Sequence, residues 1–174
     1  EKMHWRKFAL WENVIRTQLM IRVPKGLAAL PEGSANGQAN HHVTSLIDLY
    51  PTLVELCGLK ARPDLDGKSL VPLLKDPSQD WDGVAITTYD YGDYSIRSDD
   101  WHYIRYIDDS EELYNLTTDP EEWNNLASDP KYEAIKTQLA THLPKNPAPF
   151  LDSTLIPIQA HHIPPITSKE AYWE

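Results

Sequence analysis

The chain has 174 residues, of which 41% are apolar, and its 16 Lys and Arg against 26 Asp and Glu give a formal net charge of −10. This apolar content suffices for a core of ordinary domain size and excludes a disordered acidic tail. Because a nucleic-acid site needs clustered cations and a membrane span needs about 18 consecutive apolar residues, we expect neither nucleic acid nor membrane as a partner.

Charge is distributed unevenly along the chain. Basic residues prevail in residues 1–25, whereas Arg97 and Arg105 are the sole cations among the many acids between Asp76 and Asp129. Such asymmetry fits either one self-contained domain or a part of something larger.

The first half of the sequence predicts one strand and one helix. The apolar run of residues 19–23, ended by Pro24, indicates a short buried strand. A helix follows, with an N-cap at Ser45 or Asp48 and a terminating glycine at Gly58. Its apolar face is predicted from the spacing of four leucines: Leu46, Leu49, Leu53 and Leu56. Cys57 is expected to be a small core residue at the end of this helix rather than a nucleophile.

The second half predicts an antiparallel meander of about four strands. β-Branched and aromatic residues form runs at 84–89, 94–97, 101–107 and 112–116, and Gly, Asp and Ser separate these runs. The acidic residues 108–112 lack the ligand spacing and the glycine of a calcium loop, so we interpret them as a hairpin turn.

A helix over residues 130–143, with Asp129 as N-cap and Pro130 in the first position, completes this part. We therefore expect a small four-stranded antiparallel sheet packed on a C-terminal helix, an α+β subdomain over residues 81–143. Residues 144–174 are a proline-rich extension.

Two places carry candidate binding residues. Lys7 lies among aromatic residues, and a compact ammonium charge in a partly dry site suits a sulfate or phosphate oxygen. The predicted turn at residues 89–94 holds Tyr91 and Asp93, an aromatic ring and a carboxylate of the kind that stack on sugar rings and hydrogen-bond to them. A packed surface lysine and an exposed turn are the alternative interpretations.

Several ordered motifs resemble the C-terminal third of type I, formylglycine-dependent sulfatases, most closely the iduronate-2-sulfatase-like branch. They are EKMHWRKFALWE (1–12), LMIRVP (19–24), SLIDLYPTL (45–53) and LDGKSL (65–70), and then YSIR (94–97), WHYIRY (101–106), EELYNL (111–116) and DPEEWNNL (119–126). The resemblance extends to about Pro144.

The resemblance implies an α/β, alkaline-phosphatase-like sulfatase fold, of which residues 1–80 would be the closing elements of the large domain. It also implies hydrolysis of a sulfate ester by a formylglycine nucleophile beside a calcium ion. Lys7 matches the lysine that contacts the sulfate and is the one catalytic residue carried over. Cys57 is followed by Gly58 instead of the C-x-P-S-R modification motif, and the Asp-His metal pair would fall before Glu1. No metal ligand is therefore assigned to this chain.

The resulting hypothesis is the C-terminal portion of a sulfatase acting on a sugar or polysaccharide sulfate, inactive without an N-terminal portion that supplies the nucleophile and the calcium ligands. By the same resemblance the complete enzyme would be periplasmic, secreted or lysosomal. Two alternatives stay open: a related phosphate or phosphonate ester hydrolase, and a non-catalytic carbohydrate-binding or structural module.

Overall fold

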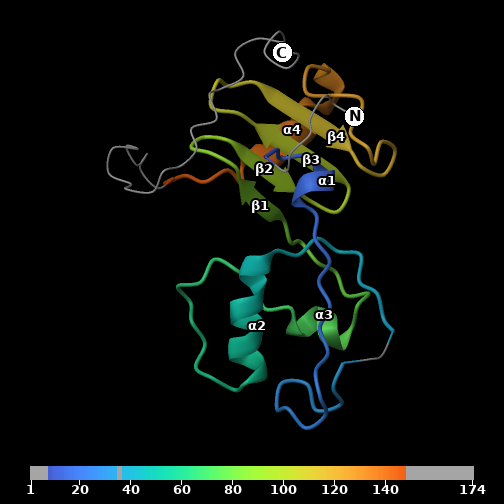
Figure 1. Ribbon diagram of the computed structural model, residues 1–174, viewed down its shortest axis with the longest axis vertical. Helices are drawn as coiled ribbons and strands as arrows, with labels where there is room; N and C mark the ends of the chain where they lie inside the picture. The colour runs from blue at the N-terminus through green and yellow to red at the C-terminus, as the bar shows by residue number, and fades with distance from the viewer. Residues whose placement is uncertain (1–7, 35–36, 148–174) are drawn as a thin grey trace, which may run out of the picture.

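The structure, a computed structural model, describes residues 8–34 and 37–147. Figure 1 shows one lobe built on a β-sheet and a second lobe of short helices and loops. The chain runs first along the sheet lobe, crosses to the helical lobe and then returns to form the sheet, so that helix α1 (Glu12–Ile15) lies beside strands that follow it by more than eighty positions. The boundaries 80/81 and 143/144 stay predictions.

The sheet is the predicted meander. Its strands are β1 (Ala85–Thr88), β2 (Tyr94–Arg97), β3 (Trp101–Arg105) and β4 (Glu111–Asn115), in the order β1-β2-β3-β4 with every pair antiparallel. The acidic residues after β3 form a hairpin turn in which the Asp108 carboxylate accepts hydrogen bonds from the N–H and the hydroxyl of Ser110. The prediction of a turn there is confirmed.

One face of the sheet forms an apolar core. The register aligns Ile96, Tyr103 and Leu113 on neighbouring strands, and all three are buried. Leu139 of helix α4 (Glu133–Ala140) packs against them. A 3-10 turn, η2 (Pro130–Tyr132), precedes α4, and the side chain of Asp129 caps it by accepting from the Lys131 N–H at 2.9 Å. The predicted helix and its cap are confirmed.

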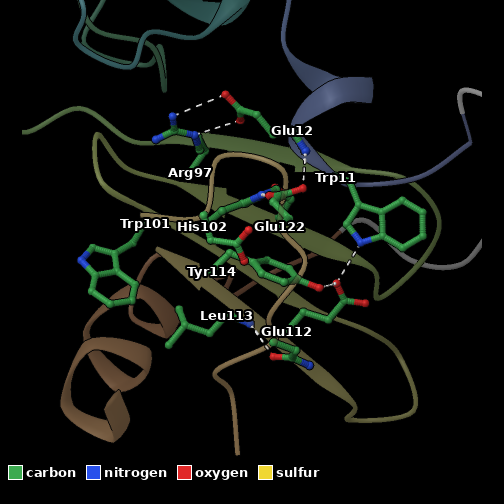
Figure 2. A network of polar contacts seen from close by, with 12 residues as sticks. Trp11, Glu12, Arg97, Trp101, His102, Glu112, Leu113, Tyr114 and Glu122 are labelled. Carbon is green, nitrogen blue, oxygen red and sulfur yellow. Dashed lines mark hydrogen bonds and ion pairs between the residues drawn. The ribbon is translucent and has the colours of Figure 1, made fainter. Parts of the chain in front are cut away.

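The opposite face is largely polar. Because side chains alternate along a strand, the residues between those of the apolar face point the other way. They are Ser95, Arg97, His102, Ile104, Glu112 and Tyr114. Residues 10–13 and the loop after β4 cover this face, as Figure 2 shows.

The helical lobe is organised around the buried carboxylate of Asp48. The helix predicted there is present as η1 (Leu46–Asp48) followed by α2 (Leu49–Leu56). The Asp48 carboxylate accepts from the Ser45 N–H at 2.7 Å, which closes the helix start, and from the Lys68 N–H at 2.8 Å, which fixes the loop leading to α3 (Val71–Lys75). A small core of Val23, Leu30, Leu56 and Val71 completes this lobe.

The predicted apolar face of α2 is wrong in part. Leu46 and Leu53 are 61% and 57% exposed, whereas Thr52 and Leu56 are buried. The helix is rotated because the Thr52 hydroxyl accepts the Leu70 N–H at 2.8 Å and so turns toward α3. Cys57 is exposed, so its prediction as a core residue is also wrong.

Residues 19–23 are not a strand. Val23 is buried, but Met20 is 88% exposed. The Val23 backbone bonds to Ser34, through its N–H to the Ser34 hydroxyl and through its carbonyl to the Ser34 N–H, instead of to a neighbouring strand. The apolar composition was sufficient for a strand, but the described part of the chain supplies no second strand beside it. Among the described residues, no helix has the length and apolar character needed to cross a bilayer.

Candidate functional site

The segment of residues 10–13 is attached by all of its side chains to the polar face of the sheet and to the loop after β4. Leu10 is 2% exposed and packs against Ile104 and Tyr114. The Trp11 indole N–H donates to Glu112 at 2.8 Å, and the Asn13 amide donates to Glu121 at 3.2 Å. The start of the described chain is thereby fixed to the sheet lobe.

Glu12 makes the strongest of these contacts. Its carboxylate accepts from Arg97 Nε at 2.9 Å and from Arg97 Nη2 at 3.4 Å, and the two side chains are 11% and 16% exposed. Its backbone N–H donates to Glu122 Oε2 at 2.9 Å. At such low exposure, a two-point guanidinium–carboxylate pair is strong and fixes orientation. Arg97 Nη1 is buried without a hydrogen-bond partner among the described residues.

A buried chain of side chains continues from this ion pair, as Figure 2 shows. Glu122 also contacts His102 Nδ1, and His102 Nε2 lies 2.5 Å from the Ser95 hydroxyl. Ser95 and His102 are fully buried, and Glu122 is 2% exposed. Glu122 has a φ of 59°, a left-handed conformation that few non-glycine residues adopt, and its hydrogen bonds hold it there.

Serine, histidine and a carboxylate in this order are also the residue types of a nucleophile, a base and an orienting acid. Here the serine hydroxyl has no exposed surface, so no substrate reaches it. The arrangement satisfies buried polar groups and is structural.

A second polar cluster lies at Glu112 on β4. Its carboxylate accepts from the hydroxyls of Tyr114 at 2.6 Å and Tyr106 at 3.1 Å, in addition to the Trp11 indole. Burial raises the pKa of both tyrosines, and the Glu112 charge raises it further. The two phenols are therefore hydrogen-bond donors over the whole physiological range.

The residues predicted to bind substrate fall in two places. Lys7 lies outside the described residues. Phe8, which follows it, is 45% exposed, and its ring centroid lies 6.1 Å from that of Tyr89, the residue directly after β1. Tyr91 is 41% exposed in the β1–β2 turn. Asp93 is half-buried and accepts the Ile107 N–H at 2.9 Å with Oδ1, so one of its oxygens holds two turns together.

The described residues contain no group of three or more His, Cys, Asp or Glu side chains that could hold a metal ion. Because calcium takes six to eight oxygen ligands, the donors in this part of the chain do not fit a calcium site.

Sequence reasoning missed the network around Glu12. Glu12 and Glu122 occurred in it only as letters of resembling motifs, and Ser95 and His102 only as strand residues. The period-2 alternation of β2 and β3 was the available signal, because it places Ser95, Arg97 and His102 on one face.

The comparisons with known proteins agree with this fold. A family model described as N-sulphoglucosamine sulphohydrolase, C-terminal, matches residues 1–148. A sulfatase of Formosa agariphila is 34% identical over 148 residues, which are 85% of this chain and 28% of that protein. Arylsulfatase K of Gallus gallus is 28% identical over 138 residues, covering 69% of this chain and 24% of its own length.

A solved structure, BT4656 in complex with its substrate D-glucosamine-2-N,6-O-disulfate, has a TM-score of 0.56 and 26% identity, over 64% of this chain and 25% of that one. The chain belongs to the sulfatase family, as its C-terminal domain. It spans about a quarter of the length of these relatives. The expected family and the sulfatase fold are confirmed, whereas the iduronate-2-sulfatase-like branch stays a prediction.

Proposed function

We propose that this chain is the C-terminal part of an enzyme that hydrolyses sulfate esters of sugars. The observation that carries the proposal is its match to the C-terminal domain of sulfatases over residues 1–148. BT4656, which the sheet and helices resemble, has a sulfated glucosamine as its substrate. The proposal includes a formylglycine nucleophile and a calcium ion, both held by residues outside the described part of this chain.

Lys7 is the proposed catalytic residue. Its ammonium group would neutralise charge on the sulfate oxygens, and on the bridging oxygen as the S–O bond breaks, and so stabilise the transition state more than the substrate. The contact between Phe8 and Tyr89 supports this role, because it brings the residue next to Lys7 against the β1–β2 turn.

Tyr91 and Asp93 are the proposed sugar-binding residues of that turn. The exposure of Tyr91 supports stacking on a pyranose ring. Asp93 uses Oδ1 for the Ile107 N–H, and Oδ2 would accept a hydrogen bond from a sugar hydroxyl. A carboxylate here would repel further sulfate groups, so the proposed substrate is a neutral or singly sulfated sugar.

The proposed partner of the chain is the remaining portion of the sulfatase. One side of η1 and α2 exposes the apolar side chains of Leu46, Ile47, Tyr50 and Leu53, each more than half exposed. An apolar surface of this kind supports coverage by another part of the enzyme. Because the chain spans a quarter of its relatives, the missing portion is the occupant we propose.

The decisive experiment compares three proteins on one sulfated monosaccharide. The complete enzyme should release sulfate, while the 174-residue chain alone should release none. Lys7→Ala in the complete enzyme should lower kcat/KM by roughly 100-fold or more, the usual cost of removing one transition-state charge contact. Turnover by the isolated chain, or an unchanged rate for Lys7→Ala, contradicts the proposal. A phosphate monoester assayed in parallel distinguishes the related phosphohydrolases.

A further inference from the structure

Residues 10–13 lie between the proposed sulfate-binding lysine and the body of the sheet lobe. Lys7 precedes Leu10 by three positions, which an extended chain spans in at most about 11 Å. Leu10 is buried, and the three residues after it each hydrogen-bond to the sheet or to the loop that follows β4. Any movement of residues 10–13 is therefore transmitted directly to Lys7.

Glu12 holds this segment through both its backbone and its side chain. The carboxylate is bound by Arg97 on β2, and the N–H is bound by Glu122 in the loop after β4. Two separate elements thus fix the position and the direction of the chain at one residue. The β2 and β4 elements are themselves fixed by their pairing with β3.

Glu122 cannot shift easily, because its other oxygen contacts His102, which lies against Ser95. All three residues are at least 98% buried. An apolar contact would attach the segment with less desolvation, since burying charges is costly even when they are paired. What the ionic contacts add is a defined geometry, and a displacement of about 1 Å at a catalytic group can reduce the rate 100-fold.

We infer that Glu12, with Arg97 and Glu122, is a positioning residue that aims Lys7 at the sulfate group; the inference rests on the proposed sulfatase function. Glu12 touches neither substrate nor reacting atoms and acts through Lys7 alone. Its effect on turnover must then disappear when the lysine side chain is removed.

A double-mutant cycle in the complete sulfatase tests this dependence. The four enzymes are the parent, Lys7→Ala, Glu12→Gln and the double variant, each assayed for kcat and KM on a sulfated sugar. Glu12→Gln keeps the shape of the side chain and removes its charge. In the parent it should lower kcat by roughly 10- to 100-fold, and in the Lys7→Ala background by less than about threefold if the two residues act as a unit. Fully additive effects overturn the inference, since a merely structural role costs the same in both backgrounds.

Two further variants keep the test decisive. Arg97→Lys retains the positive charge and should recover part of the rate lost in Arg97→Gln, and it replaces Glu12→Gln in the cycle if that variant does not fold. Arg62→Gln removes an exposed Arg62–Asp64 pair of similar geometry and should leave kcat unchanged.

The outcomes distinguish the proposed function from the positioning role of Glu12. No sulfate release by the parent contradicts the proposed function. An unchanged rate for Lys7→Ala contradicts the role of that lysine. A large Lys7→Ala effect combined with additivity contradicts the positioning role of Glu12 alone.

Discussion

The carboxylate of Glu12 accepts a 2.9 Å hydrogen bond from Arg97 Nε, and the two residues are 85 positions apart in the chain. The pair joins the N-terminal segment to the second strand of a sheet in which every strand pairs with its neighbour in sequence. Because both side chains are at least 84% buried, solvent and salt screen the interaction little.

Glu12→Ala should destabilise the folded chain by about 3 kcal/mol, because it leaves the buried Arg97 guanidinium without its counter-charge. The free energy of unfolding is measured by urea titration at pH 7. Asp64→Ala removes the partner of the exposed Arg62 and is the matched control, with an expected loss below about 1 kcal/mol. Equal losses for both variants would show that the Glu12 pair behaves as a surface ion pair.

Ser95→Ala should lower stability without removing a nucleophile. Deleting the hydroxyl leaves His102 Nε2 buried without its partner, at a cost of about 1–3 kcal/mol. A serine-directed fluorophosphonate should not label the native chain. Ser78→Ala, at an exposed serine that bonds to Asp76, is the control and should change stability little. Labelling of Ser95 would contradict its structural role.

Glu111 should make stability depend on pH in the acid range. Burial alone would raise the pKa of this carboxyl, but hydrogen bonds from Tyr103 at 2.5 Å and Lys136 at 2.9 Å outweigh burial and hold the pKa below its ordinary value of 4.5. Since the folded pKa is the lower one, the stabilisation is complete above 4.5 and is lost as the pH falls through the folded pKa.

Glu111→Gln should therefore destabilise by about 1–2 kcal/mol at pH 7, with the difference from the parent shrinking below pH 4.5. Urea titrations at several pH values measure both quantities. Glu133→Gln removes the more exposed partner of Lys136 and should have a smaller effect with little pH dependence. A difference that grows toward acid pH would reverse the sign and refute the assignment.

Gly67→Ala should disrupt the helical lobe. A Cβ at this position would lie 2.3 Å from the backbone oxygen of Ile47, so the loop that donates the Lys68 N–H to Asp48 would have to move. Gly58→Ala meets no atom and costs only the strain of its left-handed φ of 64°, about 1 kcal/mol. Thermal unfolding should show the larger drop for Gly67→Ala, and the reverse order would contradict the close approach.

Local signals in the sequence predicted local structure well. The strands, their turns and the Asp129 cap follow from alternation and turn residues within a few positions, and these features form in the structure as expected. The apolar face of α2 and the strand at 19–23 failed because apolar character does not specify a partner. Leu53 is exposed where Thr52 finds a hydrogen bond to the Leu70 N–H, and Met20 has no strand beside it in the described part of the chain.

The site was less predictable than the fold. Lys7, Tyr91 and Asp93 were named from residue type and resemblance, and their roles stay predictions. The contacts of Glu12 join positions 85 and 110 residues apart, and no local pattern specifies which cation or carboxylate a glutamate will meet across that distance.

The sequential order of the four strands bears on how the chain folds. Each hairpin closes a short loop, whereas docking residues 10–13 onto β2 closes a loop of 85 positions, and the entropy cost of closure rises with loop length. We expect the meander and α4 to assemble first and the N-terminal segment to dock after the rate-limiting step. Substitutions in the hairpins should therefore slow folding, whereas substitutions of Glu12 should mainly accelerate unfolding.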